Sequence, residues 1–345
     1  MALVTLKLVA EKAGFHVTTV SRALRGDSRI PASTRDRIQE LARGLGYSPD
    51  PLLSALSAYR RQGRLGDGST LAYLTNWQKS HPVKQHWGQA EYFPNAQERA
   101  GMMGYRLQEF SLATPGMTAK RLSEILHTRG IIGVIVQDSP YTTERELEGF
   151  QWEAFSCCTI GYSLKHPRLP RIAHSPYQSM KVAMQGLLQR GYRRIALWMP
   201  RWQDERVEYQ WSDAYWGECR RAGQEPLTLL FEKGVPSGAE LERVWKSQQP
   251  DVIMSYGYYS SERIACQQLK KKRRAPDWFV LNVRGNSTTH AGINLNLDVV
   301  GLKAVDVVAA RITRRERGPI QDHVVTQVTG NWQEGKSIRP LPSMS

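Results

Sequence analysis

The stretch from Thr5 to Tyr47 constrains the fold of this chain more than any other part of its sequence. It predicts three short helices with a tight turn between the first two. Apolar residues recur in it at helical spacing and predict a small shared core: Val9, Val20, Leu24, Ile38, Leu41 and Leu45. The small residues Ala10 and Gly14 predict a close crossing of the first two helices. The sequence therefore predicts a small all-α head.

The middle helix of this head, expected from about Val17 to Leu24, would present an unusual exposed face. That face combines a small apolar group, hydroxyls and arginines: Val17, Thr18, Ser21, Arg22 and Arg25. Hydroxyl and guanidinium groups can bond base edges and phosphates, and a small apolar group can meet a thymine methyl. This combination predicts a helix-turn-helix that reads the major groove of DNA.

The segments VAEKAGFHVTTVSRAL and STRDRIQELARGLGYSPD make the chain similar to the DNA-binding head of the lac repressor family of transcription regulators. The resemblance runs unbroken from about Val4 to Leu56 and continues more loosely to the C-terminus. It implies a homodimeric regulator, expected to be a repressor, that binds a palindromic double-stranded DNA operator. It also implies these DNA-contacting residues: Thr5, Leu6, His16, Val17, Thr18, Thr19, Ser21, Arg22, Arg25, Arg29, Thr34, Tyr47 and Leu56.

Two positions in the head depart from the family pattern. Thr5 is suited to cap the first helix, but Leu8 stands where the family usually has Asp, so a reciprocal capping box is incomplete. His16 stands where the family usually has Ser at the start of the recognition helix. A His caps less well than a Ser, although its ring could reach a phosphate. Both changes weaken helix ends without altering the core pattern.

The segment LLSALSAY (52–59) follows a Pro-containing break and is too short to form a stable helix alone in water. In the family, this segment is a hinge helix that folds on DNA. The leucine at the position of Leu56 wedges between base pairs in the minor groove. A flexible tether is the alternative. The expected domains are a head at 1–48, a hinge and linker at 49–65, and a core at 66–345.

Charge also favours a polyanionic partner. The formal net charge is +15, and residues 1–65 contain 11 Lys and Arg against 5 Asp and Glu. The head is therefore the basic focus of the chain. A basic surface kept only for solubility is the alternative explanation, but the helix-turn-helix pattern makes it the weaker one.

Other sequence features bear on location. The N-terminal MALVTLKLVAEKAGF lacks the basic and apolar regions of a signal peptide, and no stretch approaches the ~18 apolar residues of a membrane span. Cys157, Cys158, Cys219 and Cys266 have neither disulfide-framework nor zinc spacing. We therefore expect a cytoplasmic, nucleoid-associated protein with buried reduced thiols, no membrane partner and no metal.

From Ser69 onward the pattern changes to alternating strands and helices, which predicts an α/β fold with parallel sheets covered by helices. The family resemblance implies that these units form a two-subdomain core of periplasmic-binding-protein type. Strands are expected at 69–77, 105–110, 131–138, 155–162, 171–175, 193–200, 251–256, 278–283 and 323–332, and helices at 90–104, 118–130, 177–190, 237–248, 261–273 and 298–315.

Ligands of open α/β sheets bind beyond the carboxyl ends of the strands. The candidate effector-binding residues at these positions are Trp77, Asp138, Tyr162, Ser175, Trp202, Asp204, Trp211, Tyr256, Arg284 and Asn294. Taken singly, each of the aromatic ones is better explained by packing. Together they would suit a flat or hydroxylated small molecule.

Three of these positions depart from the sugar-responsive members of the family. Ser175 stands where the family commonly has Asp, Trp211 where it has Arg, and Tyr256 near a usual Asn-Asp pair. The change removes charge-assisted hydrogen bonds to ligand hydroxyls. We therefore expect the cleft to bind a more aromatic or less polar compound, or nothing.

Two further classes of function fit the sequence less well. A solute-binding receptor shares the expected core but does not account for a helix-turn-helix head. For an enzyme, the sequence has no Gly-rich phosphate loop, HExxH or GxSxG motif, and the adjacent Asp204 and Glu205 are weak evidence of acid–base chemistry. We therefore predict that the protein is not an enzyme and uses no cofactor.

Overall fold

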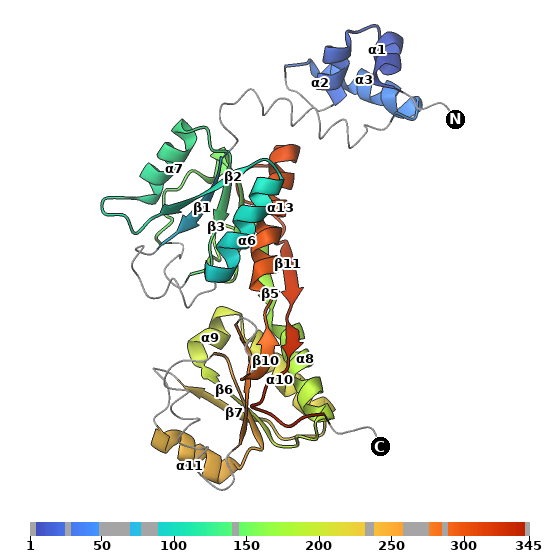
Figure 1. The fold of residues 1–345 in the computed structure, drawn as a ribbon. Coiled ribbons are helices and arrows are strands. Elements are labelled where there is room, and N and C mark those ends of the chain that lie inside the picture. Colours follow the sequence, from blue (N-terminus) through green and yellow to red (C-terminus); the bar gives the residue numbers. More distant parts are fainter. Residues whose placement is uncertain are drawn as a thin grey trace. The chain divides into compact units, whose positions relative to one another are not determined.

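The computed structural model describes residues 5–24, 29–47, 70–76, 89–139, 145–231, 238–257, 276–284 and 289–341. The chain divides into two compact units, Met1–Gly68 and Ser69–Ser345 (Figure 1). Four of the predictions lie outside the described residues: the DNA contacts Arg25 and Leu56, the cleft residue Trp77, and the helix at 261–273. The hinge at 49–65 lies outside them as well.

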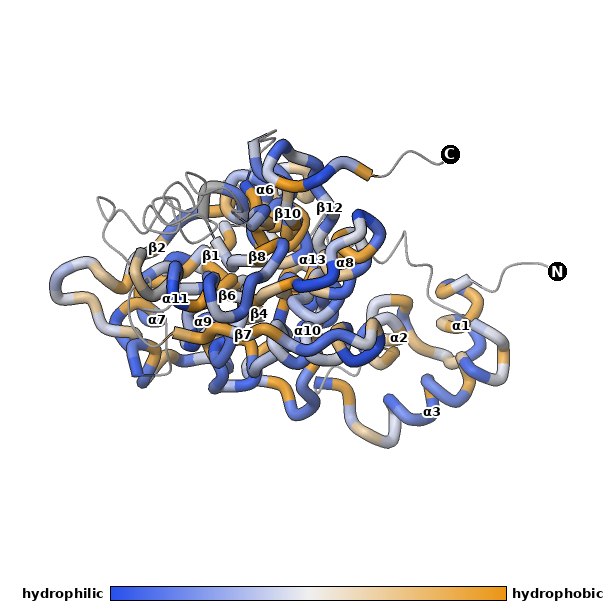
Figure 2. Tube along the Cα trace, turned by 90° about the horizontal axis from the view of Figure 1, so that it is seen from below, coloured by the Kyte–Doolittle hydropathy of each residue, from blue (hydrophilic) through white to orange (hydrophobic). Residues whose placement is uncertain are grey.

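The first unit contains the predicted three-helix head, formed by α1 (Leu6–Ala13), α2 (Val17–Leu24) and α3 (Ala32–Gly44). Val9, Val20 and Ile38, one from each helix, are fully buried together. Leu24, Leu41 and Leu45 pack partly buried against them. Figure 2 shows α3 as mostly hydrophilic with interspersed hydrophobic residues, as expected of a helix with one face on a small core.

The expectation for Gly14 was wrong. A Cβ at Gly14 would meet no atom within 4 Å, so no close helix crossing requires a glycine there. Instead, Gly14 has a φ of 71° and ends α1 in the left-handed conformation, with its N–H donating to the carbonyls of Ala10 and Glu11. Gly is therefore needed at this position for its backbone conformation. Ala10, by contrast, is buried as expected.

The second unit contains two lobes, each built on a six-stranded sheet (Figure 1). The strand order of the first sheet is β11-β5-β4-β3-β1-β2, and all its pairings are parallel. Its strands are β1 (Thr70–Thr75), β2 (Arg106–Ser111), β3 (Gly133–Val136), β4 (Ser156–Ile160), β5 (Arg171–Ser175) and β11 (Val325–Thr329).

The alternation of buried side chains along β1 places helices on both faces of this sheet. Leu71 and Tyr73 face the core that includes α6 (Gln89–Met102) and α13 (Leu297–Arg314). Ala72 and Leu74 face the core that includes α7 (Ala119–Thr128), and the 3-10 turn η1 (Trp152–Ala154) packs on this side. The first lobe is thus a three-layer α/β structure.

The strand order of the second sheet is β12-β10-β9-β8-β6-β7, with only the β10–β12 pair antiparallel. Its strands are β6 (Ile195–Pro200), β7 (Leu227–Phe231), β8 (Val252–Ser255), β9 (Asp277–Val280), β10 (Ala291–Asn294) and β12 (Asn331–Gln333). The associated helices are α8 (Pro176–Gln189), α9 (Arg201–Arg206), α10 (Gln210–Arg221) and α11 (Gly238–Gln248).

Three described segments cross between the lobes: β5 to α8, β10 to α13, and β11 to β12. The crossings are hydrogen-bonded to each other. The Asn296 amide donates to the carbonyl of Thr329 at 2.8 Å, and the Gly330 N–H donates to the Ser179 hydroxyl at 3.0 Å. These bonds fix the strands about which the lobes could rotate.

The predicted α/β class, parallel sheets and two-lobed core are confirmed. The strand region expected at 323–332 contains two strands, β11 and β12, which belong to different sheets. The segment containing α9 and α10 and the strands β7 and β10 were not predicted. Within the described residues, no helix is both long and apolar enough to span a bilayer.

Candidate DNA-reading helix and inter-lobe site

The exposed face of α2 carries the side chains expected to read DNA. Val17, Thr18 and Arg22 are exposed, whereas Val20 and Ala23 on the other side of the helix are buried. Val17 remains 36% exposed although it is apolar. An eight-residue helix with one buried side therefore leaves a small apolar group, a hydroxyl and a guanidinium available to a partner.

Side chains cap the starts of both α1 and α2. Thr5 caps α1 as expected, since its hydroxyl accepts from the N–H of Leu8 at 3.3 Å. The Nδ1 of His16 lies 2.9 Å from the Thr18 hydroxyl and accepts from the Thr18 N–H at 3.4 Å. The imidazole thus occupies the place of a capping side chain at the start of α2, turned toward its own helix.

The remaining predicted DNA contacts that the structure describes differ in exposure. Thr5, His16 and Arg29 are exposed, and Thr19, Ser21 and Thr34 are half-buried. Leu6 and Tyr47 are partly buried and pack against the head core. For these two residues the described contacts account for the side chain without a partner.

In the core, predicted cleft residues from both lobes converge. Asp138 and Tyr162 follow β3 and β4 of the first lobe, and Trp211 and Tyr256 belong to α10 and the end of β8 in the second lobe. All four are buried, with Trp211 at 0% exposure. Trp211 and Tyr256 meet edge to face, with ring centroids 6.0 Å apart.

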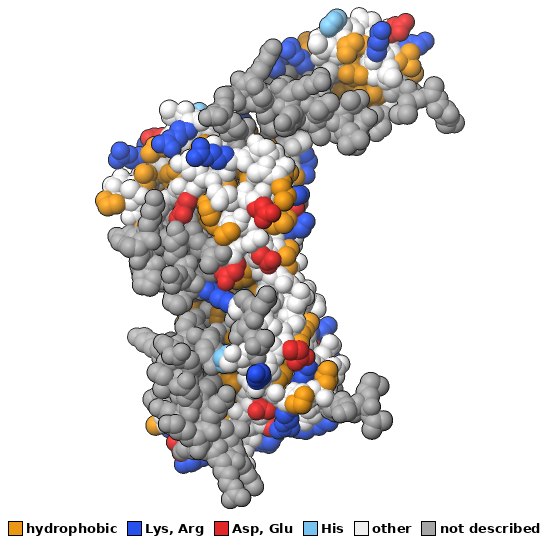
Figure 3. Space-filling model, in the orientation of Figure 1, with side chains coloured by type: hydrophobic (Ala, Val, Ile, Leu, Met, Phe, Trp, Pro, Cys, Tyr) orange, Lys and Arg blue, Asp and Glu red, His pale blue; other side chains and the backbone are white. Residues whose placement is uncertain are grey.

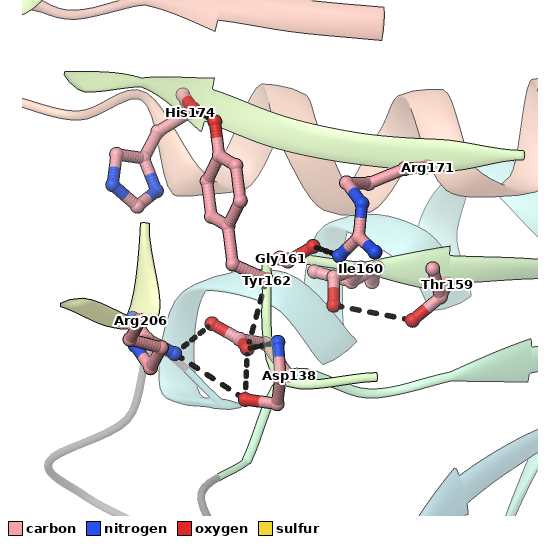
Figure 4. A network of polar contacts seen from close by, with 9 residues as sticks. Asp138, Thr159, Ile160, Gly161, Tyr162, Arg171, His174 and Arg206 are labelled. Atoms are coloured by element: carbon pink, nitrogen blue, oxygen red, sulfur yellow. Dashed lines mark hydrogen bonds and ion pairs between the residues drawn. The ribbon is translucent and has the colours of Figure 1, made fainter. Parts of the chain in front are cut away.

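Arg206, at the end of α9, supplies a charge that the sequence did not reveal. Its guanidinium forms an ion pair with Asp138 at 2.7 Å and lies 3.4 Å from the Ser163 hydroxyl (Figure 4). Burial alone would raise the pKa of Asp138, but Arg206 and the hydrogen bond from Ser163 outweigh it and hold the pKa below its usual value. The same pair raises the pKa of Arg206 despite its burial.

His174 is a second residue that sequence reasoning missed. Its ring lies between Tyr162, at 5.6 Å edge to face, and Trp211, stacked at 6.0 Å. Burial and the nearby Arg206 charge lower the pKa of His174 to about 4, against a smaller opposing effect of Asp138. The imidazole is therefore neutral at physiological pH. In β5 it is simply one residue of a short, otherwise ordinary strand, so no pattern singled it out.

Two predicted cleft residues lie at the crossings between the lobes. Ser175 caps α8 and donates its hydroxyl hydrogen to the Gln327 side chain at 3.1 Å. The same Gln327 donates to the hydroxyl of Tyr162 at 3.2 Å. Asn294 accepts from the N–H of Asn296 at 3.0 Å. The side chains of Ser175 and Asn294 are thus hydrogen-bonded within the segments that cross between the two lobes.

The other predicted residues are more dispersed. Trp202 is 38% exposed on α9, while Asp204 in the same helix is buried and accepts from the N–H of Ser212 at 3.2 Å. Burial raises the pKa of Asp204 against these hydrogen bonds. Arg284 of the second lobe lies 3.7 Å from Glu91 of α6 in the first lobe. Trp202 and Asp204 thus share α9 with Arg206, and Arg284 links the two lobes through a separate ion pair.

Some buried polar atoms near the converging residues have no hydrogen-bond partner among the residues that the structure describes. They are both ring nitrogens of His174, both side-chain polar atoms of Gln137, and the indole nitrogen of Trp211. Native interiors satisfy most such groups, so these atoms are candidates for bonds to water or a ligand. The described residues contain no His, Cys, Asp and Glu grouping that could hold a metal.

Comparisons with known proteins agree with both units. Residues 5–50 match the family model of bacterial regulatory proteins, lacI family. The sucrose operon repressor of Shigella flexneri is 27% identical over 221 residues, which cover 61% of this chain and 62% of that protein's length. The HTH-type transcriptional regulator RafR of Escherichia coli is 52% identical over 46 residues, which cover 13% of this chain and 14% of RafR.

The fold as a whole has solved relatives. The crystal structure of the lac repressor dimer bound to operator and the anti-inducer ONPF covers 97% of this chain and 99% of its own, with a TM-score of 0.55 at 14% identity. At 14% identity, this similarity shows that both units of the chain share the fold of that protein, and it shows nothing about function.

Proposed function

We propose that this chain, whose residues 5–50 match the lacI family of bacterial regulatory proteins, is a member of that family and a sequence-specific DNA-binding transcription repressor. The observation that carries this proposal is the exposed face of α2, with Val17, Thr18 and Arg22 on a buried three-helix core. Such a helix can enter the major groove and reach base edges. Regulators of this kind are not enzymes, and the proposal assigns the protein no catalysis.

The partner is a palindromic operator bound by a homodimer. A solved relative of this fold is a dimer bound to its operator, and two-fold operator symmetry mirrors that of the protein. We assign base contacts to Val17, Thr18, Ser21 and Arg22 and place Leu56 in the minor groove. Further contacts come from Thr5, Leu6, His16, Thr19, Arg25, Arg29, Thr34 and Tyr47. This assignment places the protein in the cytoplasm, where its operator is.

A small-molecule effector would bind between the lobes, where Asp138, Tyr162, Trp211 and Tyr256 converge. The ring nitrogens of His174 support this place, because they have no hydrogen-bond partner among the described residues and a bound molecule would satisfy them. Binding there would change how the lobes are closed and so change operator affinity. The aromatic walls favour a compound that is flatter or less polar than a common sugar.

The proposal of a repressor is tested by selecting DNA fragments with the full-length protein and measuring the affinity of the winning site. We expect a palindrome with a flexible pyrimidine–purine centre and a Kd on the order of 10⁻⁸–10⁻¹¹ M that weakens steeply with salt. A selection that returns no palindromic preference would overturn the proposal.

A matched pair of arginine variants makes the test specific. Arg22→Ala should weaken operator binding by roughly tenfold or more, because it removes a proposed base contact from α2. Arg43→Ala removes the same charge from an exposed position in the last turn of α3 that is not among the proposed contacts. Equal losses for the two variants would mean that only overall charge matters.

A solute-binding receptor remains the runner-up, and the head does not favour it. Residues 5–50 match a family of regulators. A solute-binding receptor does not need a helix-turn-helix head, so this match favours the regulator.

A further inference from the structure

The two lobes are joined by a buried ion pair that no crossing strand supplies. Arg206 comes from the second lobe and Asp138 from the first, and their side chains are 11% and 4% exposed. The guanidinium nitrogen that bonds Asp138 also lies 3.4 Å from Ser163, again in the first lobe. Figure 3 shows charged side chains of both signs spread over the visible surface, whereas the side chains of Asp138 and Arg206 are almost fully buried.

The Asp138 half of this pair is built within its own lobe. One carboxylate oxygen accepts from the N–H groups of Tyr162 and Ser163, each at 3.2 Å, and from the Ser163 hydroxyl at 2.6 Å. The carboxylate is therefore held in place before Arg206 arrives, and its other oxygen is left for the guanidinium (Figure 4). A preorganised acceptor reduces the entropy lost when the pair forms.

An aromatic contact crosses between the lobes beside the ion pair. The ring of His174 in β5 stacks on Trp211 in α10 with an interplanar angle of 27°. Trp211 is fully buried, and its ring also meets Tyr256 of its own lobe. The indole of Trp211 thus fills space between the two lobes.

We propose that the Asp138–Arg206 ion pair and the His174–Trp211 stack form a latch that keeps the two lobes closed when no small molecule is bound. The latch goes beyond the repressor proposal, since it concerns the core alone. Separation of the lobes would expose both charges and the indole, whereas closure pairs the charges and removes the indole from water. The closed arrangement is then the resting state of the core, and an effector acts by breaking the latch.

The latch is tested by measuring the distance between one label on each lobe in the full-length protein, with no DNA and no ligand. Cysteines introduced at the exposed positions Lys120 in α7 and Arg243 in α11 carry a donor and an acceptor dye, in a background with Cys266→Ser. The described native cysteines are buried. When Asp138, Arg206, His174 and Trp211 are all retained, we expect a single population with a short distance between the two dyes.

Variants on each side of the latch should open it. Arg206→Gln and, separately, Trp211→Leu should each lower the closed-to-open ratio at least tenfold and add a long-distance population. The control Arg314→Gln breaks a surface ion pair, with Glu316 at 2.5 Å, that lies within the first lobe alone. It should leave the distance unchanged.

The outcomes separate the latch from its alternatives. If Arg206→Gln fails to fold, Trp211→Leu decides, because it leaves no unpaired charge. The combination Asp138→Asn with Arg206→Gln should open the core no further than Arg206→Gln alone, because the two residues act as one pair. Unchanged dye-to-dye distances in a folded Trp211→Leu protein would overturn the latch. That result would not contradict the repressor proposal, which is tested separately by operator binding.

Discussion

Gly161 leaves the space that the carboxyl group of Asp138 occupies. A Cβ built on Gly161 would lie 2.1 Å from the Asp138 Cγ, far inside any real contact. Gly161 also has a φ of 71°, in the left-handed region that glycine adopts without steric cost. The ion pair between the lobes therefore depends on a residue that carries no charge and donates nothing from a side chain.

The first prediction is that Gly161→Ala strongly destabilises the core. The methyl group must displace Asp138 from its bonds to Ser163 and Arg206, which leaves a buried guanidinium short of its partner. The expected loss is about 3–5 kcal/mol, the usual cost of breaking a buried pair. Urea unfolding followed by circular dichroism measures it.

Gly191→Ala is the matched control for this prediction. Gly191 has a φ of 83°, but a Cβ added there would meet no atom within 4 Å, so this variant reports the cost of the backbone conformation alone. That cost should be about 1–2 kcal/mol. Equal losses at the two glycines would show that contact with Asp138 is unimportant.

The second prediction concerns the cysteines. Cys157, Cys158 and Cys219 are buried, and burial raises the pKa of each thiol. Both burial and the scarcity of thiolate slow reaction with a disulfide reagent. In a Cys266→Ser protein, Ellman's reagent should therefore find no reactive thiol in the native state and three after denaturation. Reaction of any of them within minutes under native conditions would contradict the described packing.

The third prediction separates the capping role of Thr5 from its proposed contact with DNA. Thr5→Ala removes the bond to the Leu8 N–H and should destabilise the head by about 1 kcal/mol. Without DNA, hydrogen exchange of the α1 amides should become roughly fivefold faster. Thr118→Ala removes the equivalent cap of α7, with a bond of 3.2 Å, and should leave α1 unchanged. Unaltered α1 exchange in the Thr5 variant would refute the capping role.

The head and the sheets could be predicted from sequence because each follows a local pattern. Helical spacing placed α2 at Val17–Leu24, the same bounds as in the structure. Short apolar runs located most of the parallel strands, since such strands are buried on both faces. The sequence did not show where β11 ends and β12 begins. The two strands follow each other closely between Val325 and Gln333, although they belong to different sheets.

The inter-lobe site was only partly predictable. Asp138, Tyr162 and Tyr256 were found because they follow strands, where the rule for ligand sites applies. Arg206 was missed because it lies in a helix, 68 residues from its partner Asp138, and nothing in its local sequence marks it. The sequence shows that Trp211 stands where the family has an arginine. Only the fold shows that the guanidinium of Arg206, in α9, lies at the inter-lobe site instead.

The last prediction is that His174 makes the core less stable in mild acid. The pKa of this residue is lowered to about 4 in the folded protein, first by burial and then by Arg206, against an opposing effect of Asp138. The unfolded chain, with a pKa near 6.5, binds more protons between these values. Stability is therefore full above pH 6.5 and falls as the pH drops toward 4, by up to roughly 3 kcal/mol.

His174→Gln isolates this effect from the carboxylates, which also titrate in acid. Asp138, whose pKa is held low, contributes stability that is lost only below its ordinary value of 3.8. Urea unfolding at pH 7.5, 6.5, 5.5 and 4.5 should show a stability difference between the two proteins that changes steadily across this range, because glutamine stays neutral throughout. Parallel pH profiles for the two proteins would mean that His174 is already accessible to protons in the native core, and the packing of its ring between Tyr162 and Trp211 would then be wrong.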